Sequence, residues 1–103
     1  MTTYGFHPDA LLEYAEATNY YLREASPEVA ETFIGVVESA IASILVDPVR
    51  WRVVEEPSIR RHVFRRPFPY VIYYRWEREL ERITIYAVMH TSREPGYWKG
   101  RIS

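Results

Sequence analysis

The first half of the chain places its apolar residues at helical spacing, in two segments that are separated by only a few residues. The first segment is predicted to begin at Pro8, because proline in the first turn followed by Asp9 is typical of a helix N-terminus. The second is predicted to begin after Ser26, a good N-cap residue, and to end at Asp47 and Pro48. Two amphipathic helices with so short a break predict an antiparallel helical hairpin.

The predicted buried stripes of the two helices follow from this spacing. In the first helix the stripe consists of Leu11, Leu12, Ala15, Asn19 and Leu22, while Glu13, Glu16 and Arg23 fall mostly off it. In the second helix the apolar positions with helical spacing are Val29, Phe33, Val36, Val37, Ala40, Ile41 and Ile44. Each stripe is expected to face the core of the protein.

The second half is rich in β-branched and aromatic residues, in short runs that predict strands. The runs are Ile59–Arg66, Tyr70–Trp76 and Arg82–His90, and a further short extended segment spans Met1–His7. Short breaks join the last three strands, which predicts an antiparallel meander. Alternation in the last strand places Ile83, Ile85, Ala87 and Met89 on one face, and Thr84, Tyr86, Val88 and His90 on the other.

The predicted fold class is therefore α+β, a two-layer β-α-α-β-β-β arrangement in which the helical hairpin packs on an antiparallel sheet. The other face of the sheet is left for water or a partner. With 103 residues the chain is expected to form a single domain over 1–103. A composition of 48% hydrophobic and 26% charged residues is typical of a folded protein and not of a disordered one. Apolar runs are short, so no membrane partner is expected.

Charge divides the chain more sharply than the net value of −1 suggests. Residues 1–49 contain one basic and eight acidic residues, whereas residues 50–103 contain twelve basic and six acidic ones. Twelve of the basic residues are arginine and one is lysine. Arginine suits bidentate contact with phosphate or carboxylate and stacking on rings. The two halves are therefore interpreted as two structural layers of one domain and not as two domains.

Cysteine is absent, which excludes a disulfide framework and a thiolate nucleophile and fits a cytoplasmic location. The three histidines have no ligand spacing, so no metal site is predicted. Four dispersed glycines cannot form a phosphate-binding loop, and no cofactor is expected.

The densest basic cluster lies on the first strand of the meander, at Arg60, Arg61, Arg65 and Arg66. Alternation places Arg61 and Arg65 on one face and Arg60 and Arg66 on the other. These residues are candidates for a surface that binds an anionic target. The alternative is an edge strand whose charges prevent aggregation.

A second candidate cluster follows the last strand, and comprises His90, Arg93, Tyr97, Trp98 and Arg101. Histidine can exchange a proton near neutral pH. Tyrosine can do so only if its pKa is lowered, and the neighbouring arginines would be the physical cause. The alternative is that Tyr97 and Trp98 clamp the C-terminal segment onto the sheet.

In several stretches the sequence resembles the RelE/ParE superfamily of toxins from bacterial type II toxin–antitoxin systems. The resemblance extends from about Thr3 to Arg101, and its most specific parts are the Tyr70–Tyr74 strand and the His90–Trp98 ending. Further matching stretches are Leu45–Pro48, Arg66–Pro69 and Ala87–Met89. The family fold has the β-α-α-β-β-β order already predicted. Membership implies a toxin neutralised by a cognate antitoxin, with which it forms a hetero-oligomer.

The resemblance implies that the antitoxin wraps the helical hairpin and the sheet. An extended antitoxin segment is expected to lie over Tyr14 and Tyr21, with its acidic residues meeting Arg61 and Arg65. These four residues are the predicted antitoxin-binding residues.

The superfamily contains two activities, and the resemblance leaves both open. A RelE-like member would cleave mRNA on the ribosome without a metal, with His90 or Tyr97 transferring protons and Arg61, Arg65 and Arg93 supplying positive charge. A ParE-like member would instead inhibit DNA gyrase without being an enzyme, through a target-binding surface of Arg60, Arg61, Arg65, Arg66, Arg93, Trp98 and Arg101. The single lysine and the His90–Trp98 ending favour the ParE-like branch. A non-toxic binding module of the same fold is a further alternative.

Overall fold

The computed structural model describes residues 1–55, 58–64, 66–94 and 96–102. Its elements follow the order β1 (Thr3–Phe6), α1 (Pro8–Glu24), α2 (Pro27–Val46), β2 (Val53–Glu55), β3 (Ile59–Val63), β4 (Tyr70–Glu77), β5 (Arg82–His90) and the short 3-10 turn η2 (Tyr97–Arg101), with a second 3-10 turn at Arg78–Leu80 between β4 and β5. The predicted α+β order β-α-α-β-β-β is confirmed, with β2 as an additional strand of three residues. Arg65, a predicted site residue, lies outside the described residues.

Both helices begin where the sequence predicts. The His7 side chain accepts a hydrogen bond from the Asp9 N–H at 3.1 Å, with proline in the first turn of α1. Ser26 caps α2 by accepting from the Val29 N–H at 3.1 Å. These side chains satisfy N–H groups that a helix leaves without partners at its start. The two helices form the predicted hairpin.

The five strands form one sheet in the order β1-β5-β4-β3-β2. Strands β3, β4 and β5 are the predicted antiparallel meander. The sheet as a whole is mixed, since β1 pairs with β5 in parallel, from Thr3 opposite Arg82 to Phe6 opposite Ile85. This pairing joins the beginning of the chain to a strand near its end.

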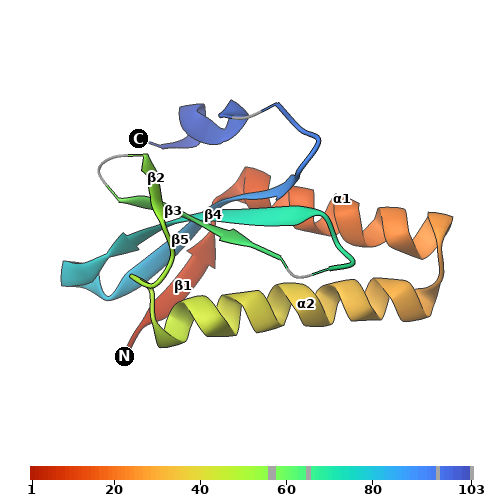
Figure 1. The fold of residues 1–103 in the computed structure, drawn as a ribbon, viewed down its shortest axis with the longest axis horizontal. Coiled ribbons are helices and arrows are strands. Elements are labelled where there is room, and N and C mark those ends of the chain that lie inside the picture. Colours follow the sequence, from red (N-terminus) through yellow and green to blue (C-terminus); the bar gives the residue numbers. More distant parts are fainter. Residues whose placement is uncertain (56–57, 65, 95, 103) are drawn as a thin grey trace.

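Figure 1 shows α2 on one side of the sheet and the C-terminal segment, in blue, on the other. The larger core lies between the helices and the sheet, around the fully buried Phe33, Ile72 and Tyr74. A smaller cluster lies on the opposite face, where Trp98 of η2 packs with Tyr73. The expectation that this face is left for water or a partner is therefore wrong where η2 covers it.

The predicted buried stripe of α1 is wrong. Leu11, Leu12 and Leu22 are 52%, 57% and 48% exposed. The buried face is instead formed by Ala10 and Ala17, with Tyr14 and Tyr21 packed partly buried against the core. Small residues let the helix approach the sheet closely, and the two long rings fill the remaining space.

The predicted faces of β5 are also wrong, because the register shifts between β4 and β5. Tyr73 lies opposite Ala87 while the next residue, Tyr74, lies opposite Ile85, so Tyr86 is an extra residue in β5. Such a β-bulge interrupts the alternation of side chains. Ile83, Ile85 and Val88 consequently belong to the helix-facing core, and Tyr86, Ala87 and Met89 belong to the opposite cluster.

By length and composition α2 could cross a membrane, the one helix of the described residues that could. Phe33, Val37, Ile41 and Ile44 are nevertheless buried within the core of the protein. A helix that packs one apolar face against a sheet meets the same criteria.

Candidate functional site

The carboxylate of Glu13 is the centre of a polar cluster between α1, β5 and η2. Arg101 of η2 donates to both of its oxygens, from Nη1 to Oε1 at 3.0 Å and from Nη2 to Oε2 at 2.8 Å. Tyr97 donates its hydroxyl to Oε2 at 2.6 Å. The backbone N–H of Val88 donates to Oε1 at 3.1 Å. Four donors from two separate elements therefore meet one carboxylate.

This cluster closes the open edge of β5. Strand β1 pairs with β5 only as far as Ile85, so the next outward-pointing backbone groups of β5 have no strand of the described residues beside them. Glu13 accepts from the N–H of Val88, and Arg101 donates to the carbonyl of Tyr86 at 2.9 Å. A salt bridge thus takes the place of a strand, and it satisfies backbone groups that would be costly to bury alone.

Two arginines flank the ring of Tyr97. The guanidinium carbon of Arg93 lies 4.0 Å from the ring centre, and that of Arg101 lies 5.0 Å from it. These are cation–π distances. Arg101 is half-buried, whereas the Arg93 side chain is 56% exposed. Arg93 is therefore the arginine of this cluster that can meet a partner.

The protonation states follow from the same contacts. Burial by itself would raise the pKa of Glu13, but hydrogen bonds from Arg101, Tyr97 and Val88 outweigh it, so the pKa of this carboxyl is lowered. Burial, together with the hydrogen bond to Glu13, raises the pKa of Tyr97. The condition under which Tyr97 could exchange a proton, a pKa lowered by its neighbouring arginines, is therefore not met, because burial and the Glu13 carboxylate have the larger effect.

Beside this cluster lies a cleft of about 460 Å³ between α1 and the ends of β4 and β5. It is rich in rings and has charged groups at its rim; the lining residues are Glu13, Glu16, Ala17, Tyr20, Tyr21, Tyr70, Val88, His90, Arg93 and Tyr97. The His90 ring packs edge-on to Tyr70 at 5.2 Å, and its Nδ1 accepts from the Ser92 N–H at 3.0 Å. The structure thus brings three residues of the predicted C-terminal cluster, His90, Arg93 and Tyr97, to one cleft, together with Tyr21 of α1.

The remaining predicted residues of the C-terminal cluster lie deeper. Trp98 is only 3% exposed and stacks on Tyr73 with the ring centres 4.5 Å apart. Its ring clamps η2 onto the sheet, and this does not fit the expected place of Trp98 in a target-binding surface. Arg101 is likewise occupied by Glu13 and the Tyr86 carbonyl.

The arginines of β3 are not gathered into one patch. Arg60 donates to the carbonyls of Val49 at 3.1 Å and Trp51 at 2.7 Å, so it fixes the loop before β2. Arg61 lines a separate depression with Tyr73, Trp98 and Lys99, among others, on the opposite face. Arg66 is exposed beyond the end of β3. The described part of the predicted cluster therefore divides between structural and accessible positions.

Tyr14 and Tyr21, the predicted antitoxin-binding residues of α1, are both half-buried. Tyr14 packs between Phe6 and Phe33, at ring-centre distances of 6.0 and 6.2 Å. Tyr21 packs against Phe33 and Phe68, both at 5.1 Å, and one side of it lines the cleft. Their contacts are mostly internal, so a partner can reach only part of each ring.

Glu13 is the principal residue that the sequence did not identify. It falls off the predicted stripe of α1, and a charged residue at such a position is expected to face solvent. Its spacing of three and four residues from the buried Ala10 and Ala17 is a signal that it shares their face. No cluster of three or more His, Asp or Glu side chains among the described residues is arranged to hold a metal ion.

Comparison with known proteins identifies the family. Residues 4–95 match the model of the ParE toxin of the type II toxin–antitoxin system parDE. A solved structure, the chromosomal ParDE toxin–antitoxin system from P. aeruginosa, has a chain similar in fold. The TM-score is 0.72 at 16% sequence identity, over 87% of this chain and 96% of that chain. Curated protein sequences yield no match. The chain belongs to the ParE toxin family of type II toxin–antitoxin systems.

Proposed function

We propose that this ParE-type toxin inhibits bacterial growth by acting on DNA gyrase, and that a cognate antitoxin neutralises it by forming a hetero-oligomeric complex with it. The match to the ParE family over residues 4–95 carries the proposal. The geometry of the Glu13 cluster supports a binding role for the cleft beside it. Among the residues that line this cleft, Arg93 supplies a positive charge and His90 supplies a ring.

The same geometry weighs against RNA cleavage by Tyr97. A tyrosine that serves as a general base needs a lowered pKa. Here the hydroxyl of Tyr97 already donates to Glu13, and its pKa is raised. Tyr97 is better suited to hold Arg93 in place, because the guanidinium of Arg93 stacks on its ring.

The decisive experiment compares two activities of the purified protein. We expect DNA supercoiling by gyrase to be inhibited while mRNA on translating ribosomes stays intact. Arg93→Ala should weaken gyrase inhibition, and Tyr97→Phe should retain most of it because the ring remains. Ribosome-dependent cleavage that His90→Ala or Tyr97→Phe abolishes would overturn the proposal in favour of a RelE-like nuclease.

Expression in a bacterial host tests toxicity itself. We expect growth to stop when the toxin is produced alone, and to resume when the antitoxin from the neighbouring gene is produced with it. Unimpaired growth with soluble protein present would favour a non-toxic binding module of the same fold. The growth assay thus tests whether the protein is toxic, and the supercoiling and cleavage assays test what its target is.

A further inference from the structure

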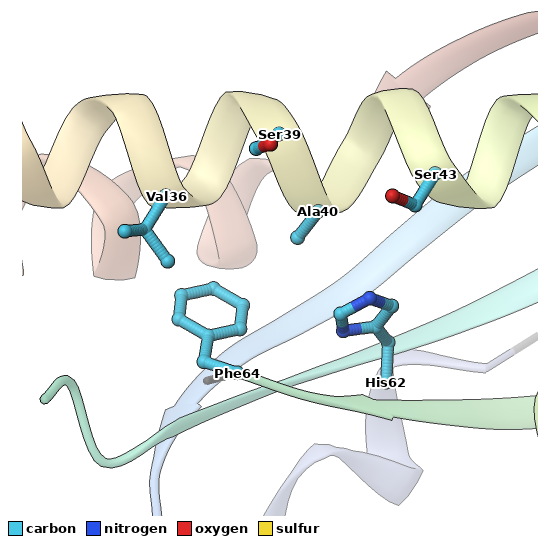
Figure 2. Close-up of a pocket in the computed structure, with 6 residues that line it drawn as sticks. All are labelled: Val36, Ser39, Ala40, Ser43, His62 and Phe64. Carbon is cyan, nitrogen blue, oxygen red and sulfur yellow. The ribbon is translucent and has the colours of Figure 1, made fainter. Parts of the chain in front are cut away.

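The three histidines of the chain differ in what meets their Nδ1 atoms. Nδ1 of His7 accepts from the Asp9 N–H at the start of α1. Nδ1 of His62 is buried without a hydrogen-bond partner among the described residues. Figure 2 shows the ring of His62 pointing from β3 toward α2, where it lines a cavity of about 180 Å³. Nδ1 of His90 instead meets two donors of one residue, the N–H of Ser92 at 3.0 Å and its hydroxyl at 2.7 Å.

The two contacts with Ser92 determine which nitrogen of His90 carries the proton. A backbone N–H can only donate, so Nδ1 is the acceptor and the Ser92 hydroxyl donates to it as well. The neutral imidazole ring has one N–H group, which in this arrangement lies on Nε2. The ring of His90 therefore offers a hydrogen-bond donor at its outer nitrogen.

A tight turn places this donor near a second one. The Arg93 N–H donates to the His90 carbonyl at 2.9 Å and closes the turn. The Thr91 N–H donates to the Pro69 carbonyl at 2.8 Å, which ties the turn to the segment before β4. His90 and Arg93 both line the cleft of about 460 Å³. The same turn thus sets the positions of an imidazole and a guanidinium along this cleft.

Ser92 acts on the ring of His90 from outside the cleft. Its side chain is exposed and is not part of the cleft lining. The ring that it holds also packs edge-on to Tyr70, with the ring centres 5.2 Å apart. An exposed histidine would otherwise exchange between rotamers, and a partner would have to fix one of them at a cost in entropy. The hydroxyl of Ser92 lowers this cost before any partner arrives.

The donors along the cleft specify the chemistry of a matching partner group. The guanidinium of Arg93 and Nε2 of His90 both donate, so each requires an acceptor, and a carboxylate is a strong one. The exposed Glu16 lines the same cleft from α1. Its negative charge opposes the dense phosphate charge of a nucleic-acid strand more than it opposes a single carboxylate. A carboxylate of a protein partner fits this cleft better than a DNA backbone.

We infer that Ser92 is a positioning residue of the target-binding cleft, which holds His90 with its proton on Nε2 so that this nitrogen, beside Arg93, donates to a carboxylate of the target protein. The inference rests on the proposed action on DNA gyrase and names a residue and a partner group for it. Ser92 itself does not touch the target.

Inhibition of gyrase supercoiling by three variants tests the role of Ser92. Ser92→Ala removes the hydroxyl and keeps the backbone N–H. We expect inhibition to weaken about threefold to tenfold, the effect of one lost hydrogen bond. Ser92→Thr keeps a hydroxyl and should restore inhibition. Thr91→Ala is the matched control, because Thr91 is an exposed residue of the same turn that does not line the cleft. Inhibition by Ser92→Ala at the level of Thr91→Ala would overturn the inference while the proposed function stands.

NMR of the His90 imidazole measures the positioning without any target. We expect the proton on Nε2 in the unaltered toxin at neutral pH, and close contacts between the rings of His90 and Tyr70. In Ser92→Ala these ring contacts should weaken, and Ser92→Thr should restore them. A proton on Nδ1 in the unaltered toxin, or a ring equally ordered in Ser92→Ala, would overturn the inference.

Binding of the toxin to gyrase without DNA identifies the partner group. We expect Ser92→Ala to raise Kd by the same factor by which it weakens inhibition. A loss that occurs only when DNA is present would assign the acceptor to a DNA phosphate and overturn the carboxylate. If the unaltered toxin neither binds nor inhibits gyrase, the proposed function is wrong and the inference falls with it.

Discussion

Glu13 and Arg101 form a bidentate salt bridge between residues 88 positions apart in the chain, with oxygen–nitrogen distances of 3.0 and 2.8 Å. Each side chain is only 14% exposed. Each also satisfies one backbone group of β5, at Val88 and at Tyr86. The pair therefore fixes both α1 and η2 to the same strand edge.

Removing the carboxylate should destabilise the protein strongly. In Glu13→Ala the guanidinium of Arg101, the Tyr97 hydroxyl and the Val88 N–H all lose a partner. We expect a loss of about 3 kcal/mol in the free energy of unfolding, because breaking a buried pair leaves the remaining charge buried without a partner. Urea denaturation measures it, with the exposed Glu16→Ala as the control on the same helix. Equal stability of the two variants would contradict this account of Glu13.

Acid should lower the folding stability of the protein, because it protonates the carboxylate of Glu13. The pKa of Glu13 in the folded state lies below its ordinary value of 4.5, so the unfolded chain binds the proton first as the pH falls. The stabilisation is complete above pH 4.5 and is lost as the pH falls through the folded-state pKa. Unfolding free energies between neutral and acidic pH should therefore decrease in the unaltered protein. In Glu13→Gln the decrease should be smaller, and an identical pH dependence would show that Glu13 does not contribute.

Arg93 should affect the target and leave the fold unchanged. Its guanidinium lies over Tyr97 and reaches no closer than 4.0 Å to Glu13. We expect Arg93→Ala to change stability by less than about 0.5 kcal/mol, as is typical of exposed positions. Gyrase inhibition should weaken about tenfold, the effect of losing one good interfacial contact. Arg78→Ala, at an exposed turn far along the sheet, is the matched control. If both variants inhibit equally, Arg93 has no part in target binding.

The N-cap of α2 offers a test of local stability. Ser26→Ala removes the oxygen that accepts from the Val29 N–H and should cost about 1 kcal/mol. Ser26→Asp keeps an acceptor at the positive end of the helix and should be close to neutral. Thermal and urea unfolding of the two variants checks the difference. A stable Ser26→Ala protein would indicate that water replaces the cap.

The helices and the meander were predictable because their signals are local. Pro8, Ser26, Pro27 and Asp47 mark helix ends by backbone chemistry that depends on a few neighbouring residues. The faces of the elements were less predictable. The bulge at Tyr86 depends on how β4 and β5 pair, and no local pattern in the sequence of β5 predicts it.

The candidate site shows the same division. His90, Arg93 and Tyr97 were found by residue type near the end of the last strand, and they do meet at one cleft. Glu13 was missed because its partners lie at the far end of the chain, and a lone acid on a helix usually faces solvent. Leu11 and Leu12 were predicted to be buried because they lie at helical spacing with other apolar residues, although the helix packs here through Ala10 and Ala17.

The parallel pairing of β1 with β5 has a consequence for how the toxin is made. Residues 3–6 leave the ribosome well before their partners at 82–85 and before the Arg101 that locks Glu13. Contacts between such distant positions form slowly, because a long loop must close before they contribute. The nascent chain therefore cannot complete the pairing of β1 with β5 until residue 85 has been synthesised, or the Glu13 cluster until residue 101 has been synthesised.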